Sequence, residues 1–343
     1  MEVDSSSHYS SSDDDSSSGD DLETDIERLM EELEADDARV AAAAAKTLNR
    51  LAAGNNAASS AIVEAGAIDP LVALAANGST AEAREWAAGA LDYLAYSRHQ
   101  AAIIEAGGTV PLVALLRNGS ASGQDTAVQA LCWLTHSDSE DALREAGAIP
   151  PLVVYLRTPA VREYLSGGWG EREEQRGFAA EALGALAHGN AANRAAIHAA
   201  GGVEALLALL RNGMAQGHAM WEHEAAGALA NLAYDDPICT AIVEAGGVEA
   251  LVAHATNDEA DGQEEAARAL RNLARSNRVA IKKLLVLRAL VTRGRAETTS
   301  RTAPSIKWLL GAGSLALPNE LIREILEFWR ATPIRAWYPS WQC

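Results

Sequence analysis

The sequence is poor in the residues and motifs that sheets and most enzymes require. Phenylalanine occurs only twice in 343 residues, and no run of alternating β-branched residues indicates a strand. The chain also lacks a phosphate-binding loop, a dinucleotide-binding fingerprint and the HExxH and GxSxG motifs of hydrolases. We therefore predict no enzymatic activity, no cofactor and no catalytic or metal-binding residue. Alanine dominates the apolar residues instead, which favours closely packed helices and predicts an all-α fold.

Cysteine pairs, a secretory signal and long apolar runs are also missing. Cys132, Cys239 and Cys343 show neither CxxC nor Cys/His spacing, so we expect reduced thiols. The first residues, MEVDSSSHYS, have neither the basic nor the apolar region of a signal peptide. No apolar stretch reaches the ~18–20 residues of a membrane span. These absences predict an intracellular protein, cytoplasmic or nuclear or both, that is not secreted, has no transmembrane segment and contacts membranes at most peripherally.

Acidic side chains outnumber basic ones, and the excess is unevenly distributed. The net charge is −19, yet residues 268–343 hold 14 basic and four acidic side chains. Residues 1–37 hold 15 acidic side chains and one basic side chain. The first part of that segment is almost entirely Ser, Asp and Gly, which bury too little apolar surface to offset the entropy of ordering. We therefore predict a disordered acidic tail over residues 1–21.

One phrase is repeated five times along the chain. The copies are AIVEAGAIDPLVALAANG (61–78), AIIEAGGTVPLVALLRNG (102–119), ALREAGAIPPLVVYLRTP (142–159), AIHAAGGVEALLALLRNG (196–213) and AIVEAGGVEALVAHATND (241–258). They begin 41, 40, 54 and 45 residues apart. A period near about 40 residues is typical of a helical solenoid, in which each unit packs only against its neighbours. The longest step contains an insertion around 161–175, which is either a partner-contacting loop or a tolerated expansion.

Each copy predicts three helices. The first ends at the glycine of Glu-Ala-Gly, because glycine readily adopts the positive φ that ends a helix. The second often begins at proline, as at Pro70 and Pro111. The third is longer and carries a phrase close to AAxALxNLA; the predicted third helices are 82–95, 122–135, 174–187, 220–233 and 261–274.

The three-helix unit resembles the armadillo repeat, with phrases similar to those of β-catenin-like and vacuolar-type scaffolds. The resemblance is carried by the segments EAG(A/G)hxxLhxLL and AAxALxNLA in five tandem copies. It implies a right-handed superhelical solenoid in which the third helices line a concave groove that holds an extended peptide. The expected segments are the disordered tail, a partial capping repeat, five full repeats, a degenerate repeat, and a C-terminal cap or short partner motif: 1–21, 22–53, 54–274, 275–311 and 312–343.

The resemblance also identifies candidate residues on the third helices. In armadillo proteins an asparagine near the end of each third helix bonds the backbone of the peptide. At that position this sequence has Arg50, Tyr93, Trp133, Ala185, Asn231 and Asn272. Helix geometry adds residues four and seven positions earlier to the same face. The predicted binding residues are Trp86, Tyr93, Gln129, Trp133, Glu181, Glu224, Asn231, Arg268 and Asn272.

Aromatic rings combined with carboxylates predict the kind of partner. Such a surface suits segments that carry Lys and Arg, through cation–π contacts and charge pairing. The sequence therefore predicts a non-enzymatic protein–protein interaction scaffold that binds an extended, basic segment of a protein or peptide. We expect neither a small-molecule substrate nor nucleic acid as the partner.

Two other functions stay open. Residues 315–329, LALPNELIREILEFW, faintly resemble the first helix of an F-box and suggest a substrate adaptor of a ubiquitin ligase. Armadillo proteins of the importin-α type make a nuclear transport adaptor the second alternative. The sequence departs from that type, because it has no tryptophan four residues before the asparagine position and has an acidic rather than a basic amino-terminal arm.

Overall fold

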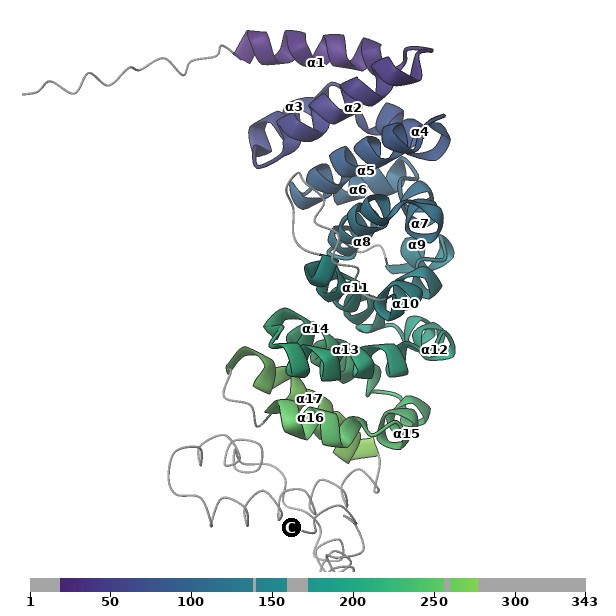
Figure 1. Cartoon of the computed structure of the whole chain (residues 1–343), viewed down its shortest axis with the longest axis vertical. Helices are drawn as coiled ribbons and strands as arrows, with labels where there is room; N and C mark the ends of the chain where they lie inside the picture. Colours follow the sequence, from purple (N-terminus) through teal and green to yellow (C-terminus); the bar gives the residue numbers. More distant parts are fainter. Residues whose placement is uncertain (1–18, 138–139, 159–171, 256–259, 277–343) are drawn as a thin grey trace, which may run out of the picture. The chain divides into compact units, whose positions relative to one another are not determined.

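The computed structural model describes residues 19–137, 140–158, 172–255 and 260–276 (Figure 1). Every regular element within these ranges is an α-helix, which confirms the predicted all-α fold. Most of the acidic tail and most of the 161–175 insertion lie outside the described residues. The same holds for everything after Ser276, which includes most of the degenerate repeat, the C-terminal segment and the F-box-like stretch.

The chain divides into two compact units, residues 1–139 and 140–343, and each is described by itself. Within the described part of unit 1, the helices are α1 Gly19–Leu33, α2 Ala38–Ala52, α3 Asn56–Glu64, α4 Ile68–Asn77, α5 Ala81–Tyr96, α6 Gln100–Glu105, α7 Thr109–Asn118 and α8 Ala121–Leu134. Helix α1 begins at Gly19, whereas the disordered tail was predicted to extend to residue 21.

The third helices of the repeats form one layer of unit 1. Helix α2 packs against α5 and α5 packs against α8, while α4 and α7 pack together in a second layer (Figure 1). Alanines dominate this packing, and Ala87 and Ala127 are fully buried. Leu91 and Leu131 supply the larger buried side chains of α5 and α8. Small residues at these contacts let the helices approach closely, as the alanine-rich composition predicts.

The first helix of each repeat ends at the predicted glycine. These glycines have φ angles from 73° to 80°: Gly66, Gly107, Gly147, Gly201 and Gly246. In unit 1 the N–H of Ala67 donates to the carbonyl of Ile62 at 3.2 Å, and the N–H of Gly108 donates to that of Ile103 at 2.8 Å. This bond across six residues is the Schellman arrangement, which needs a left-handed residue before its donor. The structure confirms the predicted role of the Glu-Ala-Gly phrase.

Unit 2 repeats the same layers. Its described helices are α9 Glu140–Glu145, α10 Ile149–Arg157, α11 Arg172–Ala187, α12 Ala191–Ala199, α13 Gly202–Gln216, α14 Ala219–Leu232, α15 Asp236–Glu244, α16 Gly247–Ala255 and α17 Ala260–Ser276. The third helices α11, α14 and α17 pack in that order, and α10, α13 and α16 form a second row (Figure 1). The observed ends of the third helices lie within two residues of the predicted ends.

An arginine on the second helix joins successive repeats of unit 2. Arg157 donates to the carbonyl of Gly201 at 2.7 Å, and Arg211 donates to that of Ala245 at 2.8 Å. The two bonds are equivalent, because each acceptor belongs to the turn that ends the first helix of the next repeat. Arg157 also lies in the last turn of α10, where a cation interacts favourably with the helix dipole.

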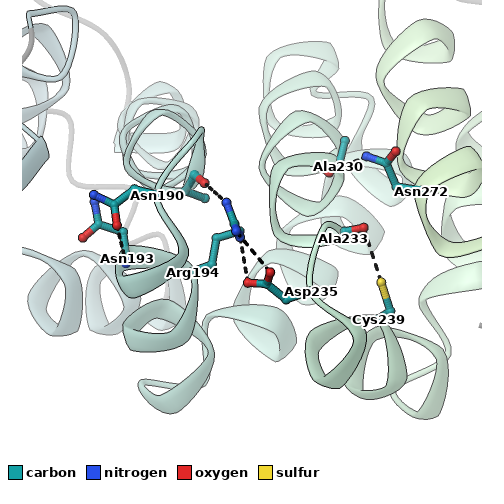
Figure 2. Close-up of polar contacts among 9 residues, drawn as sticks. Asn190, Asn193, Arg194, Ala230, Ala233, Asp235, Cys239 and Asn272 are labelled. Atoms are coloured by element: carbon teal, nitrogen blue, oxygen red, sulfur yellow. Dashed lines mark hydrogen bonds and ion pairs between the residues drawn. The ribbon is translucent and has the colours of Figure 1, made fainter. Parts of the chain in front are cut away.

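Polar contacts hold the first helices of unit 2 to each other (Figure 2). Arg194 of α12 pairs with Asp235, the residue before α15, with Nε 2.7 Å from Oδ2 and Nη2 3.1 Å from Oδ1. Asn190 caps α12 by accepting the N–H of Asn193. The buried thiol of Cys239 donates to the carbonyl of Ala233 at 3.3 Å. These contacts orient each repeat against the next.

Within the described residues, no single helix combines the length and the apolar character needed to cross a membrane. Two helix pairs, α3 with α4 and α15 with α16, reach that length and character only when taken together, and they are bent by 86° and 80°.

Candidate functional site

The predicted binding residues lie on the third helices of both units. We call the side chains that these helices present the third-helix face. In unit 1 its members are Lys46, Trp86, Tyr93, Gln129 and Trp133, from α2, α5 and α8. In unit 2 they are Glu181, Glu224, Asn231, Glu265, Arg268 and Asn272, from α11, α14 and α17. All are half-buried or exposed except Asn272, which is 8% exposed.

The ring of Trp86 makes a cation–π contact with a basic side chain of the same protein. The Nζ atom of Lys46, from α2, lies 4.8 Å from the centroid of the Trp86 ring on α5. The indole Nε1 of Trp86 donates to Glu82 Oε1, one turn earlier, at 3.3 Å. The ring with its neighbouring carboxylate therefore accepts an ammonium group in the geometry of a cation–π contact.

Trp133 is bonded to a buried carboxyl group that the sequence pattern did not reveal. Asp92, on α5, is 6% exposed, and the side chain of Trp133 donates a hydrogen bond to it. Burial raises the pKa of Asp92 well above its ordinary value, and the hydrogen bond from Trp133 opposes that shift. The Trp133 ring also packs edge-on against Tyr96, with 5.1 Å between centroids. Trp133 therefore joins α8 to α5 as well as lying on the third-helix face.

Tyr93 and Gln129 complete the predicted set in unit 1. Burial, and to a lesser degree the charge of Asp92, raises the pKa of Tyr93 to about 12. Its hydroxyl therefore stays neutral and can donate a hydrogen bond at physiological pH. Gln129 is half-buried on α8. The equivalent position on α5 is Gly89, where an added Cβ would lie 2.3 Å from Asn49 Nδ2 of α2 and would require that side chain to move.

The two asparagines of the predicted set make the same bond in successive repeats. The Asn231 amide on α14 donates to the carbonyl of Gly184 on α11 at 2.9 Å. The Asn272 amide on α17 donates to the carbonyl of Ala230 on α14, also at 2.9 Å (Figure 2). Each acceptor lies one residue before the asparagine position of the preceding third helix. These amides join neighbouring third helices, and their binding of a peptide backbone stays a prediction.

Arg268 reaches from α17 to the preceding third helix. Its Nη1 donates to Asn231 Oδ1 at 2.6 Å, and its Nη2 lies 3.4 Å from the carbonyl oxygen of Gly227. On its own helix, Nε donates to Glu265 Oε2 at 2.9 Å. The guanidinium group therefore contacts three acceptors from two helices. Both the nitrogen and the oxygen of the Asn231 side-chain amide are therefore hydrogen-bonded.

Two glutamates on the neighbouring third helices of unit 2, Glu181 and Glu265, raise the pKa of Glu224. The pKa of Glu224 is raised from 4.5 to about 7, mainly by burial and then by the charge of Glu181, while His223 lowers it and Glu265 raises it. Glu265 was not among the predicted residues. The spacing that identified Glu224 applies to it equally, because each lies seven residues before an asparagine.

Comparison with known proteins connects this geometry to a repeat family. A family model described as the Armadillo/beta-catenin-like repeat matches residues 235–275, which span α15 to α17. An engineered protein solved by a structural genomics consortium is 33% identical, with a TM-score of 0.61, over 74% of this chain and 98% of that chain. A search of curated proteins finds no significant match.

Designed armadillo repeat proteins are also similar to this chain. The one called YIII(Dq)4CqI is 27% identical, with a TM-score of 0.62, over 72% of this chain and 99% of that chain. A second, solved in complex with the peptide (KR)4, is 26% identical, with a TM-score of 0.59, over the same shares of 72% and 99%.

Proposed function

We propose that this chain, which belongs to the armadillo-repeat family, is a scaffold whose third-helix face binds an extended segment rich in lysine and arginine. The armadillo fold commonly serves as a binding scaffold for proteins or peptides and is typically non-enzymatic. One of the similar designed proteins was solved with the peptide (KR)4, so that protein takes a peptide of alternating lysine and arginine.

The observation that carries the proposal is that the third-helix face of each unit already holds a basic side chain. Lys46 lies on Trp86 in unit 1, and Arg268 lies against Asn231 and Glu265 in unit 2. An incoming basic segment needs the same groups, namely ring faces for cations, carboxylates, and amide or carbonyl oxygens. The proposed surface therefore offers acceptors of the right chemistry in both units.

The half-buried glutamates of unit 2 add to this attraction. Glu224 is shielded from water strongly enough that burial is the largest cause of its raised pKa. A charge in such a place interacts more strongly with a partner than a fully solvated charge does, because less water screens it. A basic side chain bound near Glu224 also offsets the repulsion from Glu181 and Glu265.

Binding of a fluorescein-labelled peptide of alternating lysine and arginine, measured by fluorescence anisotropy, tests the proposal. We expect the wild-type protein to bind this peptide. We expect E181Q/E224Q to bind it about tenfold more weakly, roughly 1.4 kcal/mol, because two partly buried charges that attract the peptide are lost.

The control removes two charges from the same unit but from a different helix. D236N/E244Q changes exposed residues of α15, which is a first helix of a repeat. We expect this variant to bind within about twofold of the wild type, since exposed charges contribute little. Failure of the wild type to bind, or an equal loss in both double variants, would contradict the proposal.

A further inference from the structure

Arg268 occupies the groups on unit 2 that best match an incoming basic side chain. Its guanidinium group donates hydrogen bonds to the Asn231 amide oxygen at 2.6 Å and to a carboxylate oxygen of Glu265 at 2.9 Å. It also lies 3.4 Å from the Gly227 carbonyl oxygen. An amide oxygen, a carboxylate and a backbone carbonyl together form a guanidinium site, because the planar fork of arginine presents donors in several fixed directions.

Arg268 lies beside a glycine of the preceding third helix. Gly227 of α14 and Arg268 of α17 occupy equivalent positions, four residues before Asn231 and Asn272. A Cβ added at Gly227 would lie 3.4 Å from Glu265 Oε2, so the glutamate already packs against this gap. The side chain of α17 thus lies over the bare backbone of α14.

The side chain of Arg268 is hydrogen-bonded to the protein but remains partly exposed to water. The Arg268 side chain is 30% exposed and that of Glu265 is 22% exposed, so water reaches both partners of the ion pair. Water that reaches an ion pair weakens it, because it screens the attraction between the two charges. Arg268 is therefore able to leave the site for solvent when a competing cation arrives.

We infer that Arg268 is a built-in competitor for the binding site, and that the partner enters unit 2 by placing an arginine where the Arg268 guanidinium now lies. This inference rests on the proposed function and adds two features to it. The resident arginine weakens binding of every basic segment, and the site prefers arginine to lysine, because an ammonium group cannot contact the three acceptors in the same plane.

The effect of this competition on the affinity for the partner can be calculated. A ligand that binds only the vacant site has its apparent affinity reduced by the fraction of molecules in which the site is vacant. If Arg268 occupies the site in about nine molecules of ten, its removal tightens binding about tenfold.

The experiment compares R268Q with R271Q in the full-length protein. Both variants remove one positive charge from α17, and Arg271 is exposed on the same helix. The probe is a fluorescein-labelled peptide with arginine at every second position in a Gly/Ser background, and a second peptide carries lysine instead. We expect R268Q to tighten binding of the arginine peptide about tenfold. We expect R271Q to change it by less than about twofold. The wild type should bind the arginine peptide more tightly than the lysine peptide.

The outcomes separate this inference from the proposed function. Equal tightening by R268Q and R271Q would show a general charge effect and overturn the competitor role while leaving the proposed function intact. Weaker binding by R268Q would make Arg268 a part of the receiving surface and also overturn the inference. Tighter binding by R268Q than by the wild type, with R271Q unchanged, would support the inference. Absence of binding by every variant would overturn both proposals.

A second variant protects the test against loss of folding. R268K keeps the positive charge and most of the aliphatic stem, but its ammonium group contacts fewer of the three acceptors. We expect R268K to tighten binding of the arginine peptide by less than R268Q does and by more than R271K does. Circular dichroism of each variant shows whether the helices are retained, and no difference between R268K and R271K would contradict the inference.

Discussion

At the scale of single residues, the charge state of Glu224 depends on pH near neutrality. Its pKa of about 7 lies above the ordinary value of 4.5, with burial as the first cause and the charge of Glu181 as the second. The folded state therefore holds more protons than the unfolded state between these two values. Stability from this residue is greatest at low pH and falls as pH rises through about 7.

The same shift predicts that binding of a basic peptide depends on pH. A bound cation favours the ionised form of Glu224, so the affinity of the wild type should increase from about pH 6 to pH 8 and binding should release protons. Isothermal titration calorimetry in two buffers with different heats of ionisation counts these protons. We expect E224Q to show a flatter profile and to release fewer protons. An identical profile for wild type and E224Q would rule out this role for Glu224.

Trp133 shows why residue type and spacing reveal only part of a site. Its place in the repeat predicted exposure to a partner, and it is half-buried on the third-helix face. The structure adds that its side chain donates to the buried Asp92. The sequence places Asp92 in the predicted third helix, but its burial depends on how closely α8 packs on α5. A pattern within one helix carries no information on that distance.

At the scale of elements, a buried contact between a carboxylate and an imidazole joins a third helix to the second helix of the next repeat. His254 Nδ1, on α16, lies 2.8 Å from Glu222 Oε2, on α14, and the two side chains are 5% and 4% exposed. Gly213 of α13 also packs against Glu222, since a Cβ added there would lie 2.8 Å from Glu222 Cγ. Three helices of unit 2 therefore meet at this carboxylate.

We predict that H254A lowers the free energy of unfolding by about 3–5 kcal/mol, because it leaves the carboxylate of Glu222 buried without its partner. Urea denaturation followed by circular dichroism measures this loss. H188A, at an exposed histidine, is the control and should stay within about 0.5 kcal/mol of the wild type.

The double variant E222M/H254L separates the contact between Glu222 and His254 from simple packing. It should recover most of the stability lost in H254A, since apolar side chains of similar volume commonly replace a buried ion pair without loss. A double variant as unstable as H254A would show that the contact is not the source of the effect.

At the scale of the whole molecule, the net charge of −19 affects how a basic partner arrives. Long-range attraction accelerates encounter and is screened by salt, whereas local contacts determine how long a complex lasts. The Debye length falls from about 10 Å at 0.1 M salt to about 3 Å at 1 M.

We therefore predict that the association rate constant of the lysine/arginine peptide falls about tenfold over this range of salt. Stopped-flow fluorescence measures the association and dissociation rate constants separately. E181Q/E224Q should mainly increase the dissociation rate constant, because its charges act at the binding surface. A salt effect confined to dissociation would contradict this description.

The sequence by itself determined the helical architecture. The repeated phrases predicted the all-α fold, the ends of the third helices and the glycines that end the first helices, and the structure confirms these features. They are predictable because a helix depends on residues within a few positions of one another: alanine content, apolar period, a proline at the start and a glycine at the end.

Only the tertiary structure decided what the residues of the third-helix face contact. Asn231 bonds Gly184, 47 residues earlier, and Arg268 bonds Asn231, 37 residues earlier. These partners lie in neighbouring repeats, so they depend on how two packed helices face each other across small residues such as Gly184 and Gly227. No pattern within a single repeat records which residue of the neighbouring repeat each side chain contacts.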